Sequence, residues 1–238
     1  MKRILISCDR RELGPIPNSH RVRPARPEVF IKEALVNEVI KAGAVPILLP
    51  PLPLKLLSEQ VLIELVQDVQ GVVISGGAFD IDPKHYGQTP EARLDRTDED
   101  RTQTELLLAK TVIQMKKPLL GICGGMQAMA VAQGGSLVQD IRAQIEGSLQ
   151  HEQPTNPNEG WHLVQFSPGC LNRIYGASLR VNSTHHQSVL NPGRFTVTGK
   201  SPDGVVESIE LEGQFAVGVQ WHPEFLDGHL FTALVNAS

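Results

Sequence analysis

The sequence is poor in cysteine and in net charge, and it has no long apolar run; each shortage excludes a class of protein. Its three cysteines, Cys8, Cys123 and Cys170, form no C-x-x-C pair, which argues against a disulfide framework and against a zinc site. Lys plus Arg number 22 and Asp plus Glu 26, so a formal charge of −4 gives no indication of a nucleic-acid or anionic-membrane partner. No apolar run approaches the roughly 20 residues of a membrane span, and the first residues carry no signal-peptide cleavage site. We therefore expect a protein of the reducing cytoplasm.

The composition itself suits a packed globular core. Hydrophobic residues make up 41% and charged residues 20% of the 238 positions. Because no internal repeat, low-complexity tract or interdomain linker is apparent, we expect one domain over residues 1–238.

The first half of the chain alternates short apolar runs with segments of helical periodicity. This alternation predicts a parallel sheet with helices on both faces. The expected strands are residues 4–7, 45–49, 71–75 and 118–122. The expected helices are residues 28–42, 58–69, 94–116 and 126–131, with Gly43 as a C-cap and Ser58 as an N-cap.

The second half has a different pattern. Residues 143–160 are polar and rich in Pro and Asn, which predicts an exposed loop, and residues 9–27 predict another long loop. Arg21, Arg23 and Arg26 in that loop are expected to form a solvated basic face rather than a site for an anionic substrate. Short strands are expected at 161–166, 179–182, 194–198, 205–209 and 215–220, before a final helix over 225–235.

The most specific motif is the G-x-C-x-G pattern at residues 121–125, between an apolar strand and a helix. It is the cysteine counterpart of the G-x-S-x-G nucleophile elbow, in which the glycines make room for a sharp turn that exposes the nucleophile. The N-terminus of the following helix favours the thiolate of Cys123, and the Gly124 N–H is a candidate oxyanion donor. Cys8 and Cys170 lack this context and are expected to be buried.

A thiol nucleophile needs a base, and His222 is the best candidate among the eight histidines. It follows an apolar strand, and Glu224 two residues later can hold its ring tautomer. The alternative is a surface His-Pro-Glu turn. The remaining candidates His20, His85 and His151 are expected on the surface or in loops.

Adjacent glycines at 76 and 77 follow the expected strand 71–75. They allow close approach of the backbone to a ligand, and the Gly77 N–H is a candidate second oxyanion donor. Asp80 and Asp82 lack the further ligands of a metal site, so we expect no metal there, and Asp80 is expected to shape the loop or to contact substrate.

In this order, the Gly76-Gly77 pair, the G-I-C-x-G-x-Q motif at 121–127 and the W-H-P-E motif at 221–224 resemble the class I glutamine amidotransferase superfamily. Segments 80–87, 181–187 and 201–207 resemble the γ-glutamyl-γ-aminobutyrate hydrolase group, peptidase family C26. The resemblance covers nearly the whole chain. It implies a flavodoxin-like α/β fold, a three-layer sandwich with a mostly parallel central sheet.

The resemblance also implies a Cys123–His222–Glu224 triad that hydrolyses a γ-glutamyl amide through a thioester, with polyamine or putrescine catabolism as the pathway. It implies no metal and no organic cofactor, and a small γ-glutamyl molecule as the binding partner; a homodimer stays open. The residues expected to contact substrate are Gly76, Asp80, Gln127, Ser183 and His185.

Two other functions stay open at this point. One is a glutaminase that supplies ammonia to a separate synthetase, against which segments 181–187 and 201–207 favour the hydrolases. The other is a non-catalytic sensor or scaffold, against which the complete Cys, His and Glu set argues. Many relatives carry Arg directly after the nucleophile, whereas this chain has Gly124, so the amine half of the substrate is not fixed by the resemblance.

Overall fold

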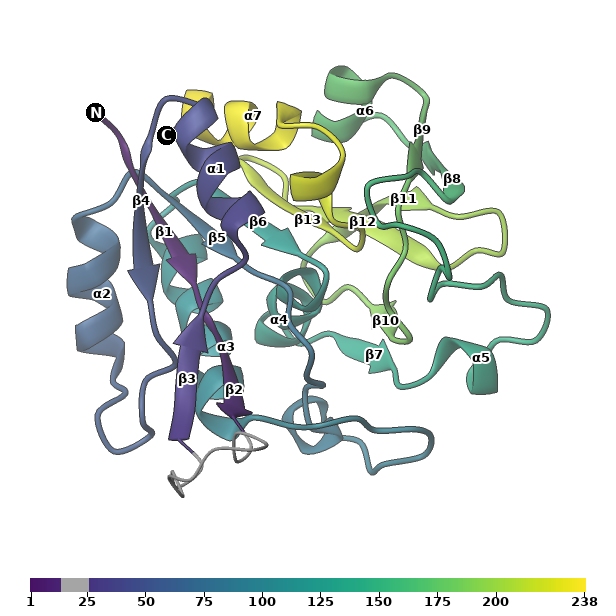
Figure 1. Cartoon of the computed structure of the whole chain (residues 1–238), viewed down its shortest axis with the longest axis horizontal. Coiled ribbons are helices and arrows are strands. Elements are labelled where there is room, and N and C mark those ends of the chain that lie inside the picture. The colour runs from purple at the N-terminus through teal and green to yellow at the C-terminus, as the bar shows by residue number, and fades with distance from the viewer. Residues whose placement is uncertain (14–25) are drawn as a thin grey trace, which may run out of the picture.

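The computed structural model describes residues 1–13 and 26–238, and within them a nine-stranded sheet runs through the middle of the molecule (Figure 1). In spatial order its strands are β4 (Val45–Leu49), β1 (Arg3–Ser7), β5 (Gly71–Ile74), β6 (Leu119–Ile122), β13 (Ala216–Val219), β12 (Val206–Glu210), β11 (Thr196–Lys200), β8 (His162–Phe166) and β9 (Ser178–Val181). The first five are parallel, and each of the last four is antiparallel to the strand before it.

Helices cover both faces of the sheet because the central strands are apolar on both sides. Successive side chains of a strand point to opposite faces, so Val73 of β5 joins one core cluster whereas Val72 and Ile74 join the other. The first cluster packs under α1 (Glu33–Lys41), α6 (Cys170–Tyr175) and α7 (His229–Ala237). The second packs against α2 (Glu59–Gln67), α3 (Glu99–Gln114) and α4 (Gly124–Ala132). The expected three-layer α/β sandwich is confirmed.

The elements expected in the first half correspond to observed elements, with differences mainly at their ends. Ser58 caps α2, since its Oγ accepts a hydrogen bond from the Val61 N–H at 3.2 Å. Gly43 follows α1 with φ +85°, a conformation that favours glycine. The expected helix over 94–116 begins only at Glu99, because Asp98 caps it through the Arg101 N–H.

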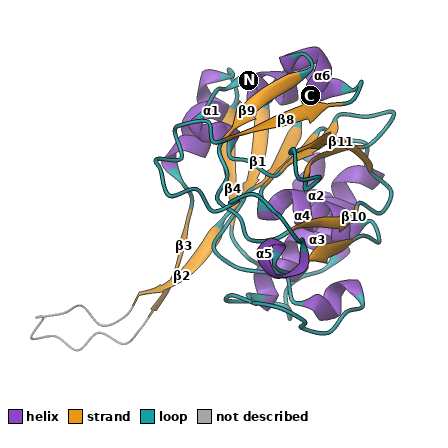
Figure 2. Cartoon of the chain, turned by 90° about the vertical axis from the view of Figure 1, so that its right-hand side faces the viewer, coloured by secondary structure: helices purple, strands orange, loops and turns teal. Residues whose placement is uncertain are grey.

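The predicted loop over 9–27 is wrong at both ends. β2 (Asp9–Leu13) and β3 (Arg26–Phe30) form an antiparallel ribbon that extends away from the body (Figure 2). The ribbon carries charged side chains rather than an apolar face, which is why its pattern predicts no strand; Arg10 instead pairs with Asp98 at the start of α3. The expected helix start at residue 28 is also wrong, because residues 28–30 belong to β3 and α1 begins at Glu33.

The loop segments between the main strands and helices contain further small elements. These are β7 (Ser136–Val138), which pairs with β10 (Ser188–Asn191), α5 (Ile141–Gln144), and the 3-10 turns η1 (Pro83–Tyr86) and η2 (Pro223–Phe225). The predicted exposed loop over 143–160 is wrong at His151 and Gln153, which are buried. His20, Arg21 and Arg23 lie outside the described residues. No helix within the described ranges combines the length and the apolar character needed to cross a membrane.

Candidate active site

Cys123 lies at the sharp turn between β6 and α4. Its backbone has φ 52° and ψ −111°, and of the non-glycine residues that the structure describes, only Lys116 shares a positive φ. Such a conformation costs on the order of 1–3 kcal/mol and is typical of functional turns. The backbone at Cys123 therefore has the form of the expected nucleophile elbow.

The glycines around Cys123 are explained by close packing. A Cβ on Gly125 would overlap the Ile74 carbonyl of β5, and a Cβ on Gly121 would overlap the Met129 side chain and lie 2.8 Å from the Gly125 carbonyl carbon. These two positions let α4 pack directly on β5 and β6. Gly124 differs, because its Cβ would have a single neighbour within 4 Å, the Gly77 nitrogen at 3.9 Å.

Adjacent parallel strands bring His222 to Cys123. β13 pairs with β6 so that Val219 lies opposite Ile122, and the Cys123 N–H donates to the Val219 carbonyl at 2.8 Å. Both chains therefore leave the sheet at the same edge, where ligands of open α/β sheets bind. A Cβ on Gly76, at the end of β5, would lie 3.0 Å from both Cys123 Cβ and His222 Cε1, so three strand ends meet at this point.

His222 is oriented by Glu224. The His222 Nδ1–H donates to Glu224 Oε1 at 2.7 Å, and both side chains are buried. This bond fixes the tautomer and leaves Nε2 for proton transfer. The structure thus brings together the three residues that the sequence predicts as a triad.

The Cys123 thiol and the His222 imidazole each shift the pKa of the other. Burial opposes ionisation of the Cys123 thiol, but the facing His222 outweighs it, so the pKa of Cys123 lies below its ordinary value. Burial also disfavours the charged imidazole, yet Glu224 and Cys123 raise the pKa of His222 to about 9. The two shifts favour a thiolate–imidazolium pair, which is the reactive form of a cysteine nucleophile.

Two residues that the sequence did not single out as site residues contact His222 and Glu224. Asn182 is fully buried beyond β9; its Oδ1 accepts from the His222 N–H at 2.8 Å, and its Nδ2 donates to the His222 carbonyl at 2.9 Å. Lys32 Nζ lies 4.0 Å from Glu224 Oε1. In the sequence, only the place of Asn182 in segment 181–187 pointed to a role at the site. Nothing in the sequence pointed to Lys32.

A buried arginine holds the loop that contains Gly76 and Gly77. Arg101 Nη2 donates to the Gly76 carbonyl at 3.2 Å, and its Nε donates to Glu105 Oε1 at 3.0 Å. A Cβ on Gly77 would overlap this guanidinium, so only glycine fits there without displacing it. Arg101 was missed because a pair spaced i, i+4 usually marks an exposed helix face.

A pocket of about 140 Å³ opens beside Cys123. The backbones of Gly77 and Gly124, predicted as oxyanion donors, line it together with Gln127 and His185, predicted to contact substrate. Gln127 Nε2 lies 3.3 Å from the Gln187 carbonyl and from Gln220 Oε1. Polar side chains and glycine backbone thus line the pocket next to Cys123.

Two predicted substrate residues have other roles in the structure. Ser183 is fully buried behind the pocket wall, where its Oγ donates to the His151 carbonyl at 2.8 Å. Gly76 lies beneath the Cys123 and His222 side chains rather than along the pocket. Ser183 is therefore better described as a structural residue of the wall.

Asp80 lines the pocket, but both oxygens of its carboxylate already have partners within the protein. One oxygen accepts the Asp95 N–H at 2.6 Å, and the other lies 3.0 Å from His186 Nε2. Burial lowers the pKa of His186, but Asp80 outweighs this effect and raises it. His186, which the sequence did not single out as a site residue, thus lines the pocket in a setting that favours its protonated form.

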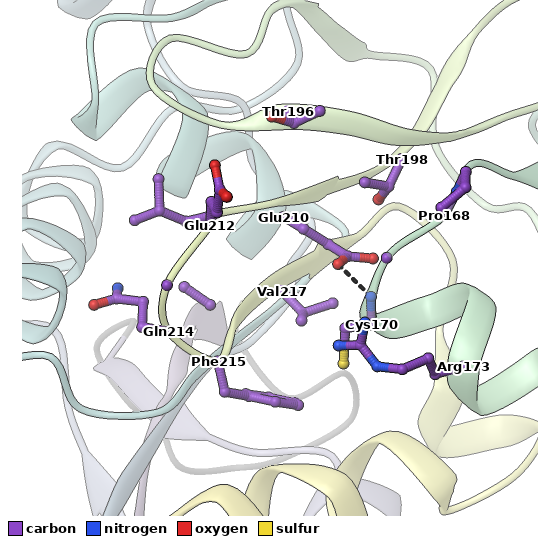
Figure 3. A pocket seen from close by; sticks show the side chains of 14 residues that line it. Pro168, Cys170, Arg173, Thr196, Thr198, Glu210, Glu212, Gln214, Phe215 and Val217 are labelled. Carbon is purple, nitrogen blue, oxygen red and sulfur yellow. Dashed lines mark hydrogen bonds between the residues drawn. The ribbon is translucent and has the colours of Figure 1, made fainter.

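A larger pocket of about 560 Å³ lies at the opposite end of β13, around Glu210, Phe215 and Cys170 (Figure 3). The Glu210 carboxylate in this pocket is already hydrogen-bonded, because it accepts the N–H groups of Cys170 and Leu171 at 2.6 and 3.0 Å. Burial, and then Glu210, raise the pKa of the Cys170 thiol. A raised pKa disfavours the reactive thiolate of Cys170, so the pocket beside Cys123 is the candidate active site.

Comparison with known proteins agrees with this geometry. The model of the peptidase C26 family matches residues 17–224. A protein named as glutamine amidotransferase-like from Rickettsia prowazekii is 32% identical over 89% of this chain and 90% of its own. The gamma-glutamyl-gamma-aminobutyrate hydrolase PuuD of Escherichia coli K12 is 32% identical over 82% of this chain and 78% of its own.

The fold is also similar to a solved structure. The crystal structure of a glutamine amidotransferase from Thermotoga maritima superimposes with a TM-score of 0.55 at 18% identity, over 94% of this chain and 76% of that one. At this identity the likeness concerns the fold alone.

Proposed function

The chain belongs to the peptidase C26 family of glutamine amidotransferase-like hydrolases, and from this membership we propose that it hydrolyses γ-glutamyl amides through a thioester on Cys123. The observation that carries the proposal is the convergence of Cys123, His222 and Glu224 at the carboxyl edge of the sheet. The thiolate and the imidazolium of this pair are the two groups that amide cleavage requires.

The first half-reaction is acyl transfer to sulfur. The Cys123 thiolate attacks the γ-carbonyl carbon, and the C–N bond breaks as His222 gives its Nε2 proton to the leaving amine. This leaves a γ-glutamyl thioester and a neutral imidazole. Glu224 stabilises the imidazolium before the transfer and keeps the ring oriented during it.

The second half-reaction releases glutamate. Neutral His222 takes a proton from water, which attacks the thioester carbon, and the C–S bond breaks to restore the Cys123 thiolate. Both tetrahedral intermediates carry a negative oxygen. The N–H groups of Gly77 and Gly124 are suited to bind it, since both residues line the pocket beside Cys123 and lie close to one another. One such donor is typically worth about 2.7–4 kcal/mol.

The substrate half that we propose is a γ-glutamyl group, with γ-glutamyl-γ-aminobutyrate or a related γ-glutamyl amine as the full substrate. The name of the Escherichia coli relative and the polar lining of the pocket support this choice. Open space around Gly124 leaves room where many relatives carry Arg, so the amine half can differ from theirs.

A panel of γ-glutamyl amides, scored by released glutamate, tests the proposal. We expect the purified chain to cleave γ-glutamyl amines unaided, and the Cys123→Ala variant to release no glutamate above background. If glutamine is turned over rapidly only when a synthetase partner is added, the protein is a glutaminase subunit. If no γ-glutamyl amide is cleaved by the chain with or without a partner, the hydrolase proposal is wrong.

A further inference from the structure

Three histidines surround one buried carboxylate behind the wall of the candidate active site. His151 Nδ1, His162 Nε2 and His185 Nε2 lie 3.3, 3.0 and 3.7 Å from Glu207 Oε1. All four residues are buried, and Glu207 is fully inaccessible. They come from separate segments, namely the loop after α5, strand β8, the loop after β9 and strand β12. The proposed hydrolysis uses none of these side chains chemically.

The outer nitrogens of two of these rings are held by groups that can only accept hydrogen bonds. His151 Nε2 lies 3.0 Å from Asp203 Oδ2, and His185 Nδ1 lies 2.9 Å from the Gln187 carbonyl. Each outer nitrogen must therefore carry the hydrogen, so in a neutral ring the inner nitrogen presents a lone pair. A histidine held in this way by a carboxylate or a carbonyl is the usual arrangement of a metal ligand.

No neighbouring donor satisfies these inner lone pairs. Ser183 Oγ lies 3.4 Å from His151 Nδ1 and 3.2 Å from His185 Nε2, but it donates its own hydrogen to the His151 carbonyl. Two lone pairs and a carboxylate therefore face one another in a dry interior. This arrangement is repulsive unless a positive charge lies between them.

The contacts with Glu207 lack the alignment of hydrogen bonds, although they are short. Both carboxylate oxygens of Glu207 and both ring nitrogens of His162 have no hydrogen-bond partner among the described residues. Such buried unsatisfied groups require a physical reason, and an ion is one of the few available. Atoms that bind a common metal point toward the metal rather than toward each other.

We propose that His151, His185 and Glu207 form a binding site for a divalent transition-metal ion of the zinc type, with His162 beside Glu207 at its edge. One potential ligand atom from each of His151, His185 and Glu207 lies within 4.8 Å of those of the other two residues. Ligands about 2.0–2.1 Å from tetrahedral zinc are roughly 3.3 Å apart, close to the 3.0–3.7 Å contacts around Glu207 Oε1. Imidazole ligands favour zinc over magnesium or calcium.

The role of this site is structural. All its ligands are buried, as in closed zinc sites, whereas a catalytic site keeps an open position. The ion would tie the loop that contains His185 to β12, and β12 is bonded to the segment leading to His222 through the Gln220 N–H and the Glu207 carbonyl at 2.8 Å. The ion would thereby stabilise the wall of the pocket without entering the reaction.

Metal content and cobalt binding test the proposal directly. The chain, prepared without a histidine tag, is dialysed against a chelator and then titrated with Zn²⁺ or Co²⁺. We expect binding to saturate at a single equivalent, with visible absorption of Co²⁺ in a low-coordinate site, and a rise in melting temperature with Zn²⁺ but not with Mg²⁺. Absence of both binding and stabilisation in the wild-type chain would overturn the proposal and favour protons as the charge in the cluster.

Variants locate the bound ion. Glu207→Gln keeps the size of the side chain and should abolish binding of the ion. Asp203→Asn, which changes the partner of the outer nitrogen of His151, should weaken binding about 10- to 100-fold. His229→Ala, an exposed histidine, and Cys123→Ala should bind as the wild type does. A folded Glu207→Gln protein with unchanged Zn²⁺ binding, or loss of the ion in Cys123→Ala alone, would refute the site. These experiments measure metal binding and melting temperature without turnover, so their outcomes do not depend on the proposed hydrolysis.

Discussion

At the scale of single residues, several local effects act on the sulfur of Cys123. Burial disfavours its thiolate, the facing His222 favours it more strongly, and Gln220 Nε2 lies 3.6 Å from Sγ as a weak donor. The positive φ of Cys123 fixes the direction of the side chain. Together these effects favour the thiolate of a buried side chain at the edge of a pocket, and this combination makes a buried cysteine a nucleophile rather than a core residue.

The ionisation of the pair predicts a bell-shaped dependence of kcat/KM on pH. Activity requires the Cys123 thiolate, so it should fall only at pH values below an ordinary thiol pKa, because the pKa of Cys123 is lowered. It also requires the proton on His222, whose pKa is about 9, so the alkaline limb should fall near that pH. Initial rates measured across the pH range check both limbs; a single limb with a midpoint at the usual thiol pKa would contradict the ion pair.

Glu224→Gln should reduce activity and move the alkaline limb. Loss of the carboxylate charge that helps raise the pKa of His222 should shift this limb to lower pH. The rate should fall by up to roughly 10⁴, the loss found when an amide replaces the orienting carboxylate of a Ser-His-Asp triad. The exposed Glu33→Gln is a matched control for removal of a carboxylate, and equal behaviour of the two variants would argue against a triad.

At the scale of elements, the site is the product of three strand ends in register. β5, β6 and β13 are neighbours, so Gly76, Cys123 and His222 leave the sheet at one edge despite their separation in the sequence. Helix α4 can begin directly at Cys123 only because Gly121 and Gly125 allow it to approach the sheet. The geometry of the nucleophile therefore depends on packing beneath it.

Gly125→Ala should destabilise the protein, whereas Gly124→Ala should not. The added Cβ at 125 would overlap the Ile74 carbonyl, which belongs to a central strand and cannot move aside easily. Overpacking of this kind costs about 1–3 kcal/mol. At 124 the new Cβ has a single neighbour at 3.9 Å, and the expected change is below about 0.5 kcal/mol. Chemical denaturation of both variants measures the difference, and equal stabilities would contradict the close approach of α4 to β5.

Arg101→Lys should lower kcat more than it changes KM. Lysine keeps the charge but lacks the planar fork that reaches the Gly76 carbonyl and Glu105 together. The Gly77 N–H would then lose its fixed direction, with a loss in kcat of up to about 10²–10³, the effect of losing one oxyanion donor. Arg101 acts here as a positioning residue. Parallel measurement of KM and of the melting temperature separates this role from a general loss of stability, which would leave kcat of the folded fraction unchanged.

At the scale of the whole molecule, the sequence predicts the parallel half of the sheet well and the polar parts poorly. Runs such as residues 71–75 and 118–122 are apolar because both faces are buried, and this pattern is visible without the fold. The ribbon of β2 and β3 has no such pattern. His151 gave a misleading signal, because a polar, Pro-rich segment usually lies in solvent, while here its ring is enclosed by histidines from distant segments. A cluster assembled from four segments leaves no spacing motif in the sequence.

The three cysteines of the chain should differ sharply in reactivity. Burial raises the pKa of Cys8 and of Cys170, whereas the pKa of Cys123 is lowered. Iodoacetamide at neutral pH should therefore modify Cys123 first and abolish activity in proportion. Peptide mass spectrometry after short exposure identifies the labelled residue. Preferential labelling of Cys170, with activity retained, would contradict the assignment, and His222→Gln should remove the advantage of Cys123.

The central claim is that Cys123 carries the γ-glutamyl group during turnover, and capture of this intermediate tests it most directly. The enzyme is mixed with a γ-glutamyl amide, quenched with acid within the first turnovers and digested for peptide mass spectrometry. The account predicts a γ-glutamyl thioester on the peptide that contains Cys123, which is absent from the Cys123→Ala variant. Undiminished hydrolysis by the Cys123→Ala variant, or an adduct on Cys8 or Cys170 instead, would contradict it.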